Sequence, residues 1–163
     1  MRELVGNAII LRRDDLGEFD ERITLFSKEW GKVRPKTISS RKPLSKLSPH
    51  VEEGNMVRVR CVEKHDLQLV DALKVAQIHS RLNDLYLLDR LLELDEPDEE
   101  LWEIISQPEF EWREILAHLG WDSTHARCTH CSQSAVAVFD LVRQSYLCER
   151  CGSYLRAGDR LLL

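Results

Sequence analysis

The sequence has 163 residues, of which 43% are hydrophobic and 31% are charged, and its formal net charge is −5. This composition is that of a folded globular chain and excludes intrinsic disorder as the main state. No apolar run approaches the roughly 18 to 20 residues that a membrane helix needs, and Glu3 and Asn7 interrupt the stretch that a signal peptide would keep apolar. We therefore expect a cytoplasmic protein whose five cysteines stay reduced.

The charge is distributed unevenly along the chain. Residues 1–64 carry a net charge of +4, residues 65–122 carry −11, and residues 123–163 carry +2. Since the acidity is confined to the middle third, both ends can still meet phosphate groups. The acidic segment is explained either by the solvated outer faces of helices or by a docking surface for a basic partner.

The first 77 residues are predicted to form five short strands. The apolar or alternating stretches are residues 7–12, 21–27, 32–39, 55–62 and 67–75. Within the fourth stretch, Val57, Val59 and Cys61 share one face, which is typical of a half-buried strand. Cys61 is accordingly interpreted as a small core residue rather than a reactive thiol. Five strands at short and regular spacing favour a small barrel or sandwich.

From residue 78 onward the hydrophobic period lengthens to three or four residues. Leucines at these steps in the segment 78–94 predict an amphipathic helix. A second helix is expected to have Pro97 in its first turn, and a third is expected to begin at Pro108. Gly120 is well placed to end the third helix.

Four cysteines form two C-x-x-C pairs in the last quarter of the sequence. They are Cys128, Cys131, Cys148 and Cys151, and 16 residues separate the two pairs. This spacing is typical of a zinc ribbon, in which four thiolates complete the coordination of one structural Zn²⁺. The intervening segments 135–139 and 143–147 are the expected strands of the ribbon. Chance thiols or disulfides are the alternative, and His125 or His130 could replace a cysteine as a ligand.

A basic tract occupies residues 28–46, where seven cations meet a single acid, Glu29. The residues predicted to contact DNA are Lys28, Trp30, Lys32, Arg34, Lys36, Arg41, Lys42 and Lys46. Such a tract can follow a phosphate backbone, and its alternative is an ordinary solvated surface. Phe26 and Trp30 could stack on bases, although packing in the core or in a turn is the interpretation that we favour for both.

Sequence patterns that carry enzymatic chemistry are missing. There is no G-x-x-x-x-G-K-[ST] loop for ATP hydrolysis, and the zinc-deaminase signature that combines H-x-E with P-C-x-x-C is missing. The remaining histidines, His50, His65, His79 and His118, show no spacing of a nucleophile and its base. We therefore expect a protein that is not an enzyme.

Two stretches together resemble the RecO family of recombination mediators. The first is AIILRRDDLGEFDERITLFSKEWGKVRPKTISSRKPLSKL, whose matching positions are Gly17-Glu18, Thr24-Leu25-Phe26, Gly31-Lys32 and Arg41-Lys42-Pro43-x-Ser45. The second is FEWREILAHLGWDSTHARCTHC, which resembles the family's helix that leads into its cysteine cluster, with Trp121 where an aromatic residue is usual. The chain resembles a short member, because only twelve residues follow Cys151 where the family usually continues with further helices.

The resemblance implies a mixed β and α fold. Residues 1–77 would form an OB-fold barrel that binds nucleic acid, and residues 78–163 a second domain with a helical part (78–122) and a zinc ribbon (123–155). It also implies binding of single- and double-stranded DNA, annealing of complementary strands, and help to RecA loading together with RecR in the bacterial cytoplasm or nucleoid. Docking of the single-strand-binding protein is a further implied function. The alternatives are an adaptor in RNA binding or transcription and, from another class, a zinc hydrolase.

Overall fold

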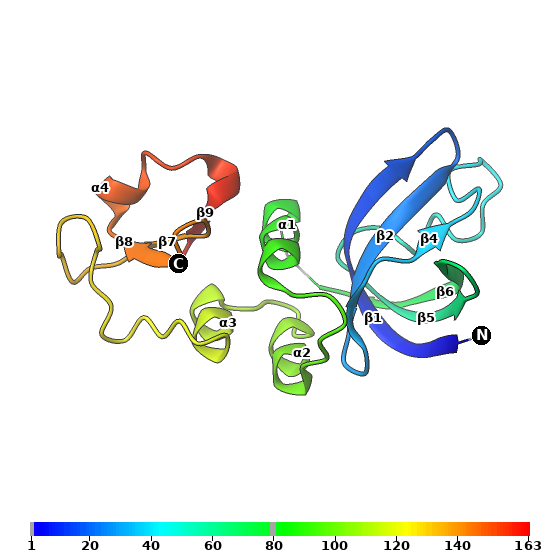
Figure 1. The fold of residues 1–163 in the computed structure, drawn as a ribbon, viewed down its shortest axis with the longest axis horizontal. Helices are drawn as coiled ribbons and strands as arrows, with labels where there is room; N and C mark the ends of the chain where they lie inside the picture. Colours follow the sequence, from blue (N-terminus) through cyan, green and yellow to red (C-terminus); the bar gives the residue numbers. More distant parts are fainter. Residues whose placement is uncertain (1, 79–80) are drawn as a thin grey trace. The chain divides into compact units, whose positions relative to one another are not determined.

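The computed structural model describes residues 2–78 and 81–163. The contacts divide the chain into two compact units, residues 1–109 and 110–163 (Figure 1). The helices near residues 82–105 therefore belong to the same compact unit as the strands, whereas the sequence analysis places the domain boundary between residues 77 and 78. That boundary stays a proposal. The expected helix 78–94 and His79 extend over residues 79 and 80, which lie outside the described residues.

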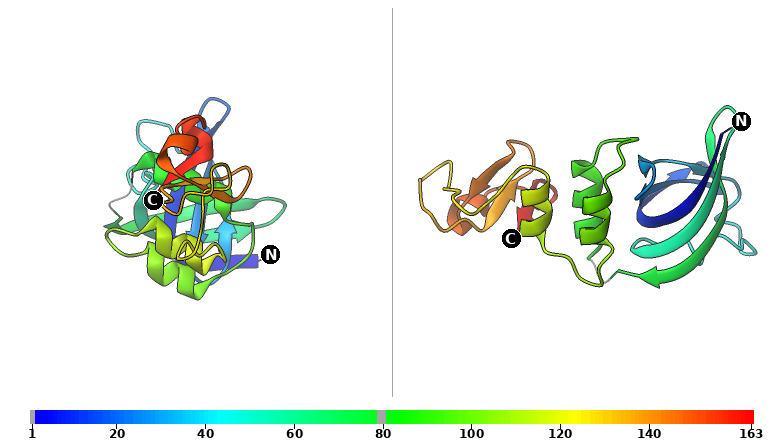
Figure 2. Two further views of the ribbon diagram at one scale, coloured as in Figure 1. Left: turned by 90° about the vertical axis from the view of Figure 1, so that its left-hand side faces the viewer. Right: turned by 90° about the horizontal axis from the view of Figure 1, so that it is seen from below.

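Six strands form the sheet of the first unit. They are β1 (Arg2–Leu16), β2 (Asp20–Ser27), β3 (Gly31–Val33), β4 (Lys36–Thr37), β5 (Asn55–Glu63) and β6 (Leu67–Gln77). The strand order is β1-β5-β6-β4-β2-β3, and an additional β1–β2 pairing closes the sheet into a barrel, whose curved strands are visible in the right-hand view of Figure 2. Closure depends on one parallel pairing, Lys36 with Gln68. This Greek-key barrel has the topology of an OB-fold, so the expected fold class is confirmed.

The expected strand 32–39 is divided into β3 and β4. Pro35 lies at the break and has no N–H to donate, although its carbonyl accepts a hydrogen bond of 3.0 Å from the backbone of Ile23. The first strand is instead much longer than expected. It starts at Arg2, and a shift in register between Ile10 and Arg12 lets it bend and pair with both β5 and β2.

Alternation along β5 fills the barrel interior. Val57, Val59 and Cys61 are buried, whereas Arg58 and Arg60 are exposed, as the sequence pattern predicts. Burial raises the pKa of the Cys61 thiol to about 12, so this side chain is neutral at physiological pH. Cys61 therefore fits its interpretation as a core residue.

Two helices cover part of the outer face of β1 and β2. Helix α1 (Leu82–Leu91) and helix α2 (Glu99–Ile105) follow the barrel in the chain. The ring of Trp102 on α2 lies 6.4 Å from that of Phe26, which is 1% exposed. Strand β2 is therefore buried on both faces at this end, which explains why its sequence alternates imperfectly.

The caps of the helices differ partly from expectation. Pro97 is not in the first turn of α2 but precedes the N-cap Asp98, whose side chain accepts a hydrogen bond of 2.8 Å from the backbone of Leu101. Helix α2 therefore begins later than expected, because the Asp98 carboxylate is the acceptor for the Leu101 N–H, which has no acceptor within the helix.

The second unit begins with helix α3 (Trp112–His118), which starts after the expected Pro108. Gly120 has a φ of +98° and donates a hydrogen bond of 3.1 Å to Ala117, and Trp121 donates one of 2.7 Å to Leu116. These two bonds are those of a Schellman motif. The expectation that Gly120 ends this helix is therefore confirmed.

The rest of the second unit is a small ribbon. Its elements are β7 (Val138–Asp140), β8 (Ser145–Leu147), α4 (Glu149–Gly152), the 3₁₀ turn η1 (Ala157–Asp159) and β9 (Arg160–Leu162). The strand order is β8-β7-β9. The two expected strands are present but shorter, and β9 has too few residues for an alternating pattern to reveal it. Within the described residues, none of the helices is long and apolar enough to span a membrane.

Candidate nucleic-acid interface and metal centre

The structure divides the basic tract into residues that contact the barrel core or the helices and residues that lie around β4 and the loop after it. Trp30 and Lys32 are buried, at 9% and 8% exposure, and Lys28 forms an ion pair of 2.6 Å with Glu99 of α2. Trp30 packs with the residues of the barrel core. Its position fits packing rather than base stacking, and the same holds for the buried Phe26.

Lys32 is turned toward helix α1. Its ammonium donates a hydrogen bond of 2.7 Å to the backbone carbonyl of Asp89 and lies 3.2 Å from the Asp89 carboxylate. Arg12 adds a second cation, 3.6 Å from the same carboxylate. Sequence reasoning missed this pair, although a signal exists: Asp89 follows Leu85 by four residues and so lies on the apolar stripe of the helix. A carboxylate on that stripe indicates a buried cation opposite.

The second group lies around β4 and the loop that follows it, and all its members except the half-buried Lys36 are exposed. Its members are Arg34, Lys36, Arg41, Lys42 and Lys46. Three of them are near acids of β1 and β2, in the pairs Arg34–Asp14 (3.4 Å), Lys36–Asp20 (3.6 Å) and Arg41–Asp15 (3.1 Å). Within residues 2–78 and 81–163, no carboxylate forms an ion pair with Lys42 or Lys46. The positive charge of this surface is thus partly neutralised and is least neutralised in the loop.

Arg22 is a further cation of this surface that sequence reasoning missed. It is exposed on β2 and lies directly opposite Lys36 of β4 and Asp14 of β1. Like charges directly opposite each other disfavour strand pairing, and here Asp14 on the other side of Arg22 offsets part of the repulsion from Lys36. The alternation of Ile23 and Leu25 into the core was the available signal, because it places Arg22 on the outer face.

A buried polar network fixes the loop to the barrel. The Ser40 hydroxyl, which is fully buried, donates a hydrogen bond of 2.6 Å to the Glu21 carboxylate. Arg13 donates to the other oxygen of Glu21 at 2.7 Å, and the Thr37 hydroxyl lies 2.7 Å from that of Ser40. The serines that precede Arg41 therefore serve at least partly as anchors, which positions the cations after them.

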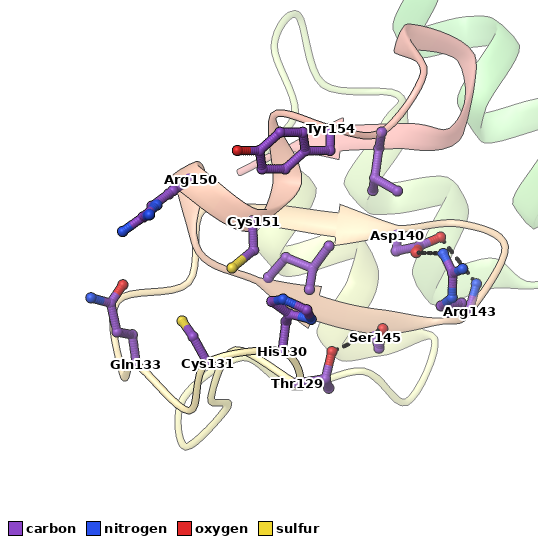
Figure 3. A pocket seen from close by; sticks show the side chains of 12 residues that line it. Thr129, His130, Cys131, Gln133, Asp140, Arg143, Ser145, Arg150, Cys151 and Tyr154 are labelled. Carbon is purple, nitrogen blue, oxygen red and sulfur yellow. Dashed lines mark hydrogen bonds and ion pairs between the residues drawn. The ribbon is translucent and has the colours of Figure 1, made fainter.

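The four predicted metal ligands meet at one point of the ribbon. The sulfur atoms of Cys128, Cys131, Cys148 and Cys151 all lie within 4.8 Å of one another. Cys131 and Cys148 have sulfurs 3.6 Å apart. A tetrahedron with Zn–S bonds of about 2.3 Å has sulfur separations of about 3.8 Å, so the group is close enough to hold one metal ion. Figure 3 shows Cys131 and Cys151 from two separate segments facing each other.

The surroundings of the sulfurs favour unequal ionisation in the absence of a cation. Burial opposes ionisation of Cys128, but backbone N–H groups of Cys148, Cys131 and His130 outweigh it and lower its pKa to about 6. Burial and the neighbouring thiols raise the pKa of Cys151 to about 12. A bound cation favours the thiolate form of every ligand, which these four groups can supply. His125 and His130 are both exposed, and the described group of possible ligands consists of the four cysteines.

A cavity of about 750 Å³ lies beside the cysteines in the second unit (Figure 3). Its polar lining is engaged within the ribbon: Arg143 pairs with Asp140 at 3.1 Å, and the hydroxyls of Thr129 and Ser145 are 3.5 Å apart. We assign this cavity no chemistry of its own.

The comparisons with known proteins agree with this architecture. Residues 1–79 match the family model described as the N-terminal domain of recombination protein O. The barrel is therefore similar to the RecO N-terminal domain in sequence and has the topology of an OB-fold, and the match covers 79 of the 163 residues. This match supports a general role in DNA repair and recombination. No curated protein matches the chain.

Proposed function

We propose that this protein is a non-enzymatic mediator of DNA repair and recombination. It binds single- and double-stranded DNA, anneals complementary strands and assists RecA loading together with RecR. The observation that carries the proposal is the match of residues 1–79 to the RecO N-terminal domain, on a closed barrel that presents an anchored basic loop.

The proposed DNA contacts are the exposed cations of this surface and the half-buried Lys36. They are Arg22, Arg34, Lys36, Arg41, Lys42 and Lys46. The proposed set leaves out Lys28, Trp30 and Lys32, because these side chains are engaged with α2, the barrel core and α1. Contacts to phosphate carry no sequence information, so we expect binding that is indifferent to base sequence.

Annealing follows from charge neutralisation alone. Two DNA strands repel each other through their phosphates, and a protein surface that neutralises several of them lowers this repulsion. In the free protein, three of the proposed contact residues form ion pairs with Asp14, Asp15 and Asp20. When DNA binds, its phosphates must replace these carboxylates as the partners of the cations. We expect this exchange to moderate the affinity and allow a strand to leave once it has paired.

The ribbon is proposed to bind one structural Zn²⁺ through its four cysteines. An all-cysteine site leaves no open position for a water molecule, so the metal would stabilise the second unit rather than perform chemistry. The docking of RecR, and that of the single-strand-binding protein, are proposed from the similarity to the RecO family. Part of the acidity expected to attract a basic partner is used internally, because Glu99 and Glu103 pair with Lys28.

A strand-annealing assay tests the proposal. The variant Arg41→Ala with Lys42→Ala should bind DNA more weakly and anneal complementary strands more slowly than the parent. The control is Arg58→Ala with Lys74→Ala, which removes two exposed positive charges from the β5 and β6 region and should leave both activities unchanged. Equal affinity for structured RNA, with no annealing by the parent, would favour an RNA-binding adaptor instead.

A further inference from the structure

Phe19 is an exposed aromatic residue in the turn between β1 and β2. Its side chain is 40% exposed, while Gly17 in the same turn takes a φ of +77°. The residues flanking the turn, Leu16 and Asp20, are paired across the two strands. The turn therefore has a defined position on the barrel, and Phe19 stands on it without belonging to the buried core.

The basic loop is bonded directly to this turn. The backbone of Arg41 donates a hydrogen bond of 3.1 Å to the carbonyl of Phe19, and the guanidinium of Arg41 reaches the carbonyl of Gly17 at 3.4 Å. The backbone of Ser39 donates to the Asp20 carboxylate at 2.8 Å. Loop and turn thus form one surface, although 22 positions separate Phe19 from Arg41 in the sequence.

A cation lies over the ring. The ammonium of Lys42 is 5.6 Å from the centroid of the Phe19 ring, and within the described residues it has no carboxylate partner. An aromatic face beside unneutralised positive charge matches one nucleotide, whose base can stack on the ring while its phosphate meets the ammonium. The proteins that bind single strands combine these two features.

The rest of the barrel explains why the aromatic group lies here. OB-folds bind oligonucleotides on their second and third strands and in adjoining loops, among them the loop between the first two strands. In this chain α2 covers Phe26, and Trp30 is in the core. The turn that carries Phe19 precedes the first residue of β2, whereas α2 contacts Phe26 near the last residue of this strand, so the Phe19 side chain remains accessible.

We propose that Phe19 is a stacking site for an unpaired nucleobase of single-stranded DNA. The inference rests on the proposed function and adds that the surface distinguishes single strands from duplexes, since a paired base is not free to stack. Arg41 and Lys42 hold the flanking phosphates, and Phe19 supplies the contact that depends on the base.

The test compares oligothymidine with an abasic strand of equal length. Phe19→Ala should weaken binding of oligothymidine by roughly 5- to 150-fold, leave the salt dependence unchanged and leave the abasic strand bound as by the parent. Phe19→Trp should restore the affinity, and its added fluorescence should be quenched by oligothymidine. Tyr86→Ala is the matched control, because Tyr86 is 39% exposed and has Arg12 at 5.7 Å over its ring.

The outcomes separate this inference from the proposed function. If Phe19→Ala binds oligothymidine as the parent does, while the Arg41 and Lys42 double variant binds weakly, stacking is refuted and the proposed function stands. Equal weakening toward both strands, or an equal effect of Tyr86→Ala, would show a structural role and also refute stacking. If the parent binds neither strand, the proposed function itself is refuted.

Discussion

Lys32 is expected from the sequence to contact DNA, but in the structure it forms a buried ion pair with Asp89. Its ammonium and the Asp89 carboxylate are each about nine-tenths buried, which makes the pair costly to break on one side only. We predict that Asp89→Ala lowers the free energy of unfolding by about 3 kcal/mol, because a buried cation loses its main partner. Urea denaturation measures this value. The double variant Lys32→Met with Asp89→Leu should regain most of the stability, and a loss from Asp89→Ala of only a few tenths would contradict the prediction.

Asp140 provides a second test at the level of one residue. Burial disfavours its charge, but hydrogen bonds from the backbone and side chain of Arg143 and from the backbone of Val142 outweigh it and hold its pKa below the usual range. A carboxylate with a lowered pKa stabilises the fold above its unfolded pKa of about 3.9, and this contribution is lost as the pH falls through the folded value. Carboxyl NMR should give a midpoint below 3.9. Arg143→Ala should raise it, and an ordinary midpoint in the parent would disprove the assignment.

At the scale of the elements, Gly31 at the start of β3 is closely enclosed by the segment around Glu96. Gly31 has a φ of +70°, and an added Cβ there would lie 2.2 Å from the backbone carbonyl oxygen of Glu96. Gly17 has a similar φ of +77°, but its Cβ would meet nothing within 4 Å. Gly17→Ala should therefore cost about 1–2 kcal/mol for the left-handed backbone alone, and Gly31→Ala clearly more. Thermal unfolding of the two variants compares them, and equal losses would contradict the enclosure of Gly31.

The elements could be predicted wherever one local pattern decides them. Alternation located β5, and Gly120 marked the end of α3, because both depend on residues close together in sequence. The division of the expected strand has a local signal in Pro35, whereas the brief β9 depends on pairing with the distant β7. For the same reason the cysteine spacing predicted a group of sulfurs that could hold a metal ion, whereas the burial of Lys32 could not be predicted, because it depends on Asp89, 57 residues away.

The ribbon is an element whose stability we expect to depend on metal. The second unit buries few large side chains around its cysteines, so a bound Zn²⁺ would supply folding free energy. We predict one zinc per chain in freshly purified, reduced protein, measured by elemental analysis. Cys148→Ser should lose the metal and expose residues 128–151 to proteolysis, whereas Cys61→Ala, a cysteine of the barrel core, should retain it. Protein without stoichiometric zinc would refute the site.

At the scale of the whole molecule, the net charge of −5 conceals a local surface of opposite sign. Acids are concentrated in residues 65–122, and some of them neutralise cations of the first 64 residues, as Asp89 does for Lys32. What remains positive is the surface around β2, β4 and the basic loop. The acidic helices thus cover one part of the barrel, and the part that we propose to contact phosphates stays accessible.

The salt dependence of DNA binding measures how large that remaining surface is. If Arg22, Arg34, Lys36, Arg41, Lys42 and Lys46 each neutralise one phosphate, the slope of log K against log salt on single strands should be about −4, from roughly 0.7 per contact.

Arg41→Ala with Lys42→Ala should make this slope shallower by about 1.4, and Arg22→Ala by about 0.7, with similar losses on unrelated sequences. The Arg58 and Lys74 double variant controls for total charge and should leave the slope unchanged. Fluorescence anisotropy at several salt concentrations gives all these slopes. A parent slope near −1.4 would mean that only Lys42 and Lys46, which have no carboxylate partner in the described part of the chain, exchange counterions for DNA. A slope that does not change in any variant would place the DNA elsewhere on the protein, because each proposed contact contributes its own release of counterions.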